Sequence, residues 1–169
     1  MKKLIFGLTI FLGYCCSDGD LEIETIDFDS VGIQQCGSVT TDTRILFKIN
    51  GDEALVLTLQ AGVLKNEVST ETIQSTVPGQ SEITYRIFDG TVNSGYFCDD
   101  IPPVAPVVTE EITAEDGLVL INTVATEDSS FEHTIQLQGI SLVNNQGERI
   151  TDLTINDFGS VVTTSSTED

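Results

Sequence analysis

The sequence predicts an all-β protein, specifically an antiparallel β-sandwich of immunoglobulin-like or related architecture with one disulfide. Valine, isoleucine and threonine are abundant, and Gly, Asn and Asp clusters separate short segments in which apolar and polar residues alternate. No segment carries a sustained apolar stripe of helical period, so no helix is expected. The chain lacks the tryptophan of antibody domains, and the immunoglobulin label therefore describes architecture only.

The alternation predicts nine strands. They cover residues 21–29, 43–49, 53–60, 67–74, 82–88, 107–113, 118–126, 131–143 and 149–156. Residues 63–75 are also long enough for a short helix. The β-branched side chains at positions 68, 70, 72 and 73 favour an extended conformation there.

The clearest hairpin is expected around the Asn-Gly-Asp sequence at positions 50–52. A two-residue Asn-Gly turn places Phe47 opposite Ala54, whereas a three-residue loop places Phe47 opposite Leu55. The three-residue loop gathers the larger side chains on one face, as a buried face requires, and is the expected register. Lys48 then lies on the opposite, partly solvated face.

Residues 131–138 alternate cleanly, and the phase of the alternation changes at Gly139. A glycine at such a change indicates a β-bulge. His133 shares its face with Phe131 and Ile135. We therefore expect a packed or rim histidine there rather than a catalytic one.

The first twenty residues indicate export. Lys2 and Lys3 precede an apolar run at positions 4–12 that is far too short to span a bilayer. The sequence Leu-Gly-Tyr-Cys-Cys at positions 12–16 resembles the lipobox of bacterial lipoproteins. The Ser-Asp-Gly-Asp sequence that follows resembles the surface-export tag of Bacteroidetes-type lipoproteins.

This resemblance implies that residues 1–15 are a removable signal peptide and that Cys16 receives lipid, with Cys15 as the alternative. An ordinary secretory signal is the other interpretation. Residues 16–20 then form an acidic tether at the outer membrane or cell surface. Two or more acyl chains give stable anchoring, so the membrane is an expected partner through the lipid anchor.

The rest of the chain has the length of one domain, expected at 21–160 and followed by a flexible tail at 161–169. Three prolines fall within residues 101–106, where a subdivision into two small β-domains is the alternative. One domain is favoured, because the second half has few residues and no disulfide of its own.

Charge and cysteine content narrow the function. Removing residues 1–15 takes away two of the seven basic residues and none of the 27 acidic ones, which leaves a net charge of −22. Such a chain repels phosphate backbones, so no nucleic-acid partner is expected. Only Cys36 and Cys98 remain outside the signal, and we expect them to form one disulfide worth about 4 kcal/mol in the chain-entropy model.

The sequence carries no nucleophile elbow, phosphate-binding loop or dinucleotide fingerprint, and it has a single histidine. We therefore expect no catalytic residues and no enzyme activity. Calcium is the one cofactor considered, with weak candidate ligands in expected loops: Asp99, Asp100, Glu115 and Asp116. Without an EF-hand-like pattern this remains a compositional signal, and no metal site is assigned.

The expected function is that of a non-enzymatic interaction or structural module with a protein or glycan partner. The alternative is a lipoprotein that binds a ligand, either carbohydrate or calcium. Outside the signal the only tyrosines are Tyr85 and Tyr96 and no tryptophan occurs, so a sugar site would depend on hydrogen bonds. A cleft of converging carboxylates would favour ion binding, whereas an exposed apolar patch would favour a protein partner.

Overall fold

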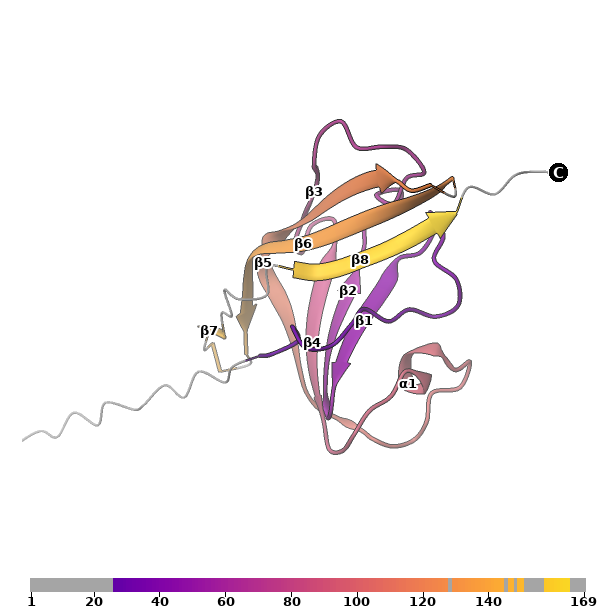
Figure 1. The fold of residues 1–169 in the computed structure, drawn as a ribbon. Helices are drawn as coiled ribbons and strands as arrows, with labels where there is room; N and C mark the ends of the chain where they lie inside the picture. Colours follow the sequence, from indigo (N-terminus) through magenta and orange to yellow (C-terminus); the bar gives the residue numbers. More distant parts are fainter. Residues whose placement is uncertain (1–25, 128, 145, 148, 151–156, 165–169) are drawn as a thin grey trace, which may run out of the picture.

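The computed structural model describes residues 26–127, 129–144, 146–147, 149–150 and 157–164. The chain is mostly antiparallel β, with 50% strand and 3% helix, which confirms the predicted β class. Its elements are β1 (Ile45–Asn50), β2 (Glu53–Thr58), β3 (Ile73–Thr76), β4 (Glu82–Phe88), α1 (Gly95–Cys98), β5 (Val108–Ala125), β6 (Ser130–Val143), β7 (Arg149–Ile150) and β8 (Asp157–Thr164) (Figure 1).

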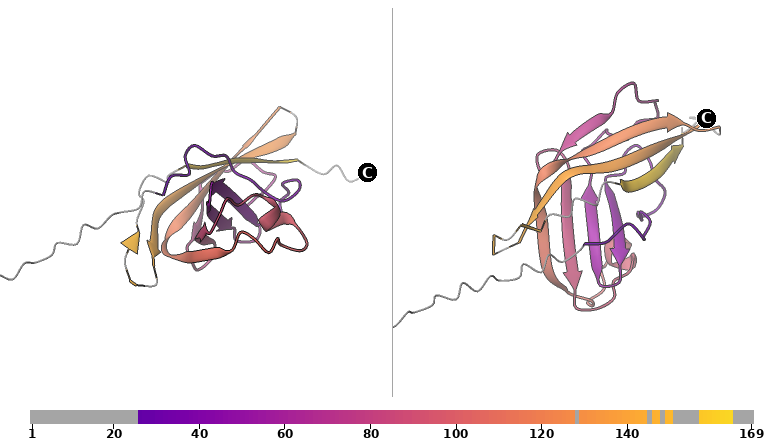
Figure 2. Two further views of the ribbon diagram at one scale, coloured as in Figure 1. Left: turned by 90° about the horizontal axis from the view of Figure 1, so that it is seen from below. Right: turned by 60° about the vertical axis from the view of Figure 1, so that its left-hand side comes forward.

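The strands form one curled half-barrel sheet in the order β1-β2-β4-β5-β6-β7, with β3 also paired to β5 and β8 to β6. The long β5 pairs with β4 along its first part and with β3 along its second part. The sheet therefore bends along β5 and β6, and its two halves face each other (Figures 1 and 2). Strands predicted at 107–113 and 118–126 are in fact the single strand β5.

The bend depends on two glycines. Asp116 lies opposite Ser141 and Leu118 opposite Gln138, so β6 has one extra residue at Gly139. This confirms the bulge that the phase change predicts. Gly139 has a φ of 64° and Gly117 a φ of 137°. A Cβ at Gly117 would lie 3.0 Å from Ile140 Cα, so a side chain there would push the two strands apart.

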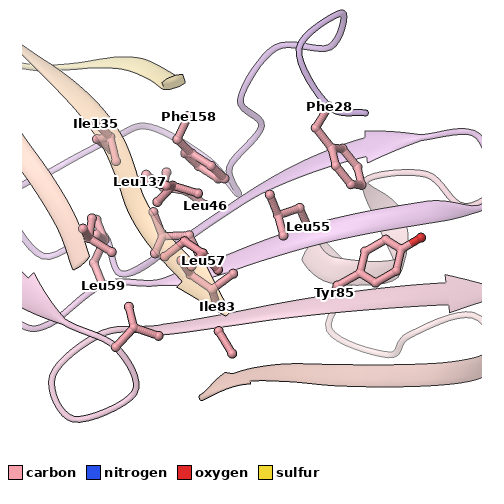
Figure 3. Packing of buried hydrophobic residues seen from close by; sticks show 14 of the residues in the cluster. Phe28, Leu46, Leu55, Leu57, Leu59, Ile83, Tyr85, Ile135, Leu137 and Phe158 are labelled. Atoms are coloured by element: carbon pink, nitrogen blue, oxygen red, sulfur yellow. The ribbon is translucent and has the colours of Figure 1, made fainter. Parts of the chain in front are cut away.

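The main core fills the space between the two halves of the sheet. Ile135 and Leu137 of β6 and Phe158 of β8 face Leu46 and Leu57 across it (Figure 3). All five are at most 2% exposed. Burial of each such side chain contributes about 1.5–3 kcal/mol, which makes this cluster the main source of stability.

A second apolar cluster lies beside α1, on the other face of β1 and β2. Phe47 stacks on Phe97 at 4.5 Å between ring centroids, and Phe88 meets Tyr96 edge-on at 4.9 Å. The predicted disulfide is confirmed here, with Cys36 and Cys98 joined by an S–S bond of 2.02 Å. This bond and the rings hold the segment that ends in α1, a short helix that the sequence did not predict.

Residues 26–34, named here the strap, cross the open side of the half-barrel. Ile26 and Phe28 are buried in the core, and the Phe28 ring meets Tyr85 edge-on at 6.3 Å (Figure 3). Gln34 forms an isolated bridge with Phe47 of β1. The strand predicted at 21–29 is wrong for residues 26–29, because these residues bury Ile26 and Phe28 in the core without pairing to a neighbouring strand. Residues 21–25 lie outside the described part.

The hairpin register also differs from the expectation. Phe47 lies opposite Val56, so the turn is the two-residue Gly51-Asp52, and neither predicted register holds. The backbone N–H groups of Phe88 and Val92 donate to the carbonyl oxygens of Asp52 and Gly51. Contacts from distant residues therefore fix this turn, and they are invisible in the local sequence.

Two further boundaries are corrected. The strand predicted at 67–74 is the shorter β3, because Ser69 joins β5 only through hydrogen bonds with Thr123 and makes no continuous ladder. Residues 161–164, predicted as part of a flexible tail, belong to β8, where Val161 and Thr163 are buried. Residues 165–169 lie outside the described part.

Candidate functional site

The open side of the half-barrel contains a cavity where the edge strands β1 and β8 approach each other under the strap. Its volume is about 470 Å³, within the range of roughly 300–1,000 Å³ usual for small-ligand sites. The lining residues come from three separated segments of the chain: Asp29, Val31, Gly32, Ile33, Lys48, Asp157, Phe158, Gly159 and Ser160. We call this cavity the seam pocket.

Lys48 of β1 provides the buried charge of the seam pocket. Lys48 is only 4% exposed. Its Nζ donates a hydrogen bond to the carbonyl oxygen of Phe28 at 2.9 Å and lies 5.6 Å from the centroid of the Phe158 ring. An ammonium group has three N–H donors, and the described residues provide one acceptor, Phe28 O. Burial of a charge with incomplete pairing is costly, so Lys48 is an unusual feature of this core.

Two carboxylates accompany the ammonium. Asp29 of the strap and Asp157 at the start of β8 are both exposed and both line the seam pocket. Burial lowers the pKa of Lys48, while the charges of Asp29 and Asp157 act in the opposite direction. In the described part of the chain no direct ion pair joins Lys48 to either carboxylate. The three charged groups therefore surround a space without neutralising one another in contact.

The local sequence explains how the seam pocket is built. Lys48 alternates with Leu46, and the observed register places both on the core face of β1, which corrects the expectation that Lys48 lies on a partly solvated face. Gly159 lets the strap approach β8, because a Cβ there would lie 3.0 Å from Ile33 Cδ1. The sequence analysis did not predict Asp29, Lys48 or Asp157 as site residues; the alternation of Leu46 and Lys48 is the local signal that could have indicated a buried lysine.

A second buried polar group lies in the other half of the sheet. His133 has no exposed surface, and its Nδ1 and Nε2 lie 2.8 Å from the hydroxyl oxygens of Thr123 and Thr163. Thr163 donates its hydroxyl hydrogen to Asn66 Oδ1, so it accepts from His133 Nε2–H. Thr123 then donates to Nδ1, and His133 is the neutral Nε2–H tautomer. Burial lowers its pKa, consistent with this neutral form.

The candidate calcium ligands lie in two separate parts of the fold. Asp99 and Asp100 are exposed directly after α1, whereas Glu115 and Asp116 are exposed on β5 and not in the loop that the sequence suggested. The described residues contain no group of three or more His, Cys, Asp or Glu side chains that could hold a metal ion. Cys16 and Cys15, the candidate lipid acceptors, lie outside the described part.

The fold and its seam pocket define a disulfide-bonded antiparallel β-protein whose open side is crossed by a strap. Comparison of the chain with protein-family models, with curated proteins and with solved structures gave no match. Within the described residues, no helix is long and apolar enough to cross a bilayer.

Proposed function

We propose that this protein is an exported, lipid-anchored, non-enzymatic interaction module at the outer membrane or cell surface. The observation that carries the proposal is an apolar surface segment at residues 101–107, named here the apolar loop. Ile101 is 85% exposed, Val104 is 95% exposed and Val107 is 49% exposed. Residues 101–107 carry no polar side chain and six of the seven are exposed, and an exposed apolar segment of this kind favours an interaction site.

The surroundings of the apolar loop favour a protein partner. Its first residue follows the exposed Asp99 and Asp100, and the preceding segment is held by the Cys36–Cys98 disulfide and the Phe47–Phe97 stack. A well-anchored segment loses little conformational entropy on binding. The acidic flank and the net charge of −22 that remains without residues 1–15 disfavour a second copy and an anionic lipid surface. The partner that fits is a protein with an apolar groove bordered by basic side chains.

Site-specific photocrosslinking in intact producing cells tests this proposal. A photoreactive residue at Val104 should give one discrete protein adduct, whereas the same residue at the exposed Val68 serves as the control and should not. Asp99→Lys combined with Asp100→Lys should reduce the yield of that adduct, because steering by the acidic flank is reversed. Adducts with lipid, with a second copy, or equal adducts at both positions would contradict the proposal.

The lipid anchor has its own test. Labelled palmitate should enter the protein, and mass spectrometry should place the acyl groups on Cys16, with Cys15 as the alternative. Replacement of both cysteines should release the protein from the membrane fraction. A membrane-bound and unlabelled double variant would remove the basis for the proposed location.

The predicted immunoglobulin-like or related sandwich remains part of the proposal. Its support is that the two halves of the bent sheet face each other across one core. That core includes residues from before and after the apolar loop, such as Tyr85 and Ile135, which supports one domain over residues 21–160.

The seam pocket favours a second candidate function, binding of a small ligand. The specific observation is a buried ammonium in a cavity of ligand size with two carboxylates beside it.

A further inference from the structure

We infer that the seam pocket binds a neutral polyhydroxylated ligand, a sugar unit with neighbouring hydroxyl groups, held between Lys48 and the carboxylates of Asp29 and Asp157. This inference rests on the second candidate function and is independent of the apolar loop and its protein partner. It follows from the donors and acceptors that the pocket offers, from its charge balance and from its apolar wall.

The donors and acceptors match hydroxyl groups. Lys48 Nζ has N–H groups beyond the one that Phe28 O accepts, and Asp29 and Asp157 offer acceptor oxygens. A hydroxyl group accepts from an ammonium and donates to a carboxylate at the same time. It therefore suits a space in which Lys48 and the two carboxylates influence one another without forming a direct ion pair.

The charge balance disfavours ionic ligands. An anion would meet two carboxylates on a chain whose net charge without residues 1–15 is −22. A divalent cation would meet the Lys48 ammonium, and the described residues hold no group of three metal-ligating side chains. A neutral ligand uses both kinds of charge without bringing a further charge out of water.

The remaining lining suits the C–H face of a sugar ring. Val31 and Ile33 of the strap are half-buried and line the seam pocket, and Gly32 and Gly159 leave backbone there without side chains. These aliphatic groups and the open backbone supply the apolar contact surface, because the Phe158 ring in the lining has no exposed surface and cannot serve as a stacking platform. The lining of the seam pocket thus combines aliphatic side chains and open backbone with charged groups.

The test uses the full-length lipidated protein in detergent micelles, with methyl groups labelled for NMR. Glucose, galactose, mannose and N-acetylglucosamine are the sugar probes, and calcium chloride, sodium phosphate and glycine are the ionic ones. We expect a saturable shift of the Ile33 and Val31 methyl signals with at least one sugar and no shift of Ile83, which lies in the core away from the pocket lining.

Matched variants locate the binding. Asp29→Asn and Asp157→Asn should each weaken the sugar affinity roughly tenfold, as expected when a charged acceptor is replaced by a neutral one. Lys48→Met should abolish the shift. Asp42→Asn removes the same charge from an exposed site outside the pocket lining and should leave the affinity unchanged. The two exposed aspartate positions keep the test valid if Lys48→Met fails to fold.

Three results would overturn the inference. If glycine, phosphate or calcium shifts the Ile33 and Val31 methyl signals saturably and no sugar does, the pocket is a ligand site but not a sugar site. A sugar shift that survives all three pocket variants would place binding elsewhere. If no probe shifts these methyl signals, both this inference and the second candidate function are rejected.

Discussion

Lys48 and His133 are two ionisable side chains buried in different halves of the same sheet, and their surroundings differ. Both ring nitrogens of His133 are hydrogen-bonded to threonine hydroxyl groups, and the hydroxyl of Thr163 in turn donates a hydrogen bond to Asn66. Lys48 donates one hydrogen bond, to a carbonyl oxygen, and lines a cavity that two carboxylates also line. A closed polar network indicates a structural role, whereas an open one indicates a place for a ligand.

The largest expected effect is on the closed network. His133→Ala should lower the free energy of unfolding by about 3–5 kcal/mol, because it leaves a cavity, deprives the buried Thr123 hydroxyl of its acceptor and removes the donor to Thr163. Urea denaturation measures this change. Thr134→Ala, next to it on β6 and half-buried, is the control and should cost under about 1 kcal/mol. A similar small loss for His133→Ala would show that the network is not structural.

A pH series sharpens the same comparison. Burial holds the pKa of His133 below its usual value of 6.5 in the folded protein, so the unfolded chain binds this proton first as the pH falls. His133 therefore leaves stability unchanged above about pH 6.5 and lowers it progressively below that, before most carboxylates titrate near pH 4. Urea denaturation at pH 7 and pH 5.5 should show a drop in the wild type that His133→Ala largely lacks. An equal drop in both proteins would assign it to other groups.

The open site should respond differently. Lys48→Met keeps an unbranched side chain that is one atom shorter and removes a buried charge, so the free energy of unfolding should stay within about 1 kcal/mol of the wild type or rise. The sugar-dependent methyl shift should disappear in the same variant. Thermal and urea unfolding together with the titration measure this separation. A loss above about 3 kcal/mol would instead make Lys48 a structural group like His133.

The smallest effect concerns the carboxylates. Asp29→Asn and Asp157→Asn should change stability little, because both side chains are exposed. Each should move the pKa of Lys48 further below its usual value, because a charge that favours the ammonium is lost. The shift of the Lys48 side-chain Cε signal with pH measures this, with Asp42→Asn as the matched control. An unchanged titration in both variants would mean that neither carboxylate acts on Lys48.

Local signals predicted much of the fold. The alternation gave β4 with the observed ends and β6 to within one residue, and Gly139 marked the bulge. The parity of His133 with Ile135 correctly placed it on the buried face. The β1–β2 turn was wrong because amides of Phe88 and Val92, more than thirty residues away, fix Gly51 and Asp52.

The seam pocket could not be predicted from local sequence patterns. Asp29 belongs to residues 26–29, the part of the strap that was expected as a strand, and Asp157 lies at the start of β8, which follows on directly from the last predicted strand. Nothing local links these two residues to Lys48. The carboxylate pairs proposed as calcium ligands stay exposed, Asp99 and Asp100 directly after α1 and Glu115 and Asp116 on β5, because adjacency in the chain does not bring two side chains to one site.

The sequence by itself determined the β class, the single disulfide, the strong negative charge and the buried histidine, because alternation, cysteine count and composition act locally or over the whole chain. Only the tertiary structure decided that the strands curl into one half-barrel and that its edge strands β1 and β8 line one cavity under the strap. Which strands line it depends on the bend at Gly117 and Gly139 and on packing of Phe28 and Phe158 into a shared core. These are contacts between residues far apart in the chain, and no local pattern encodes them.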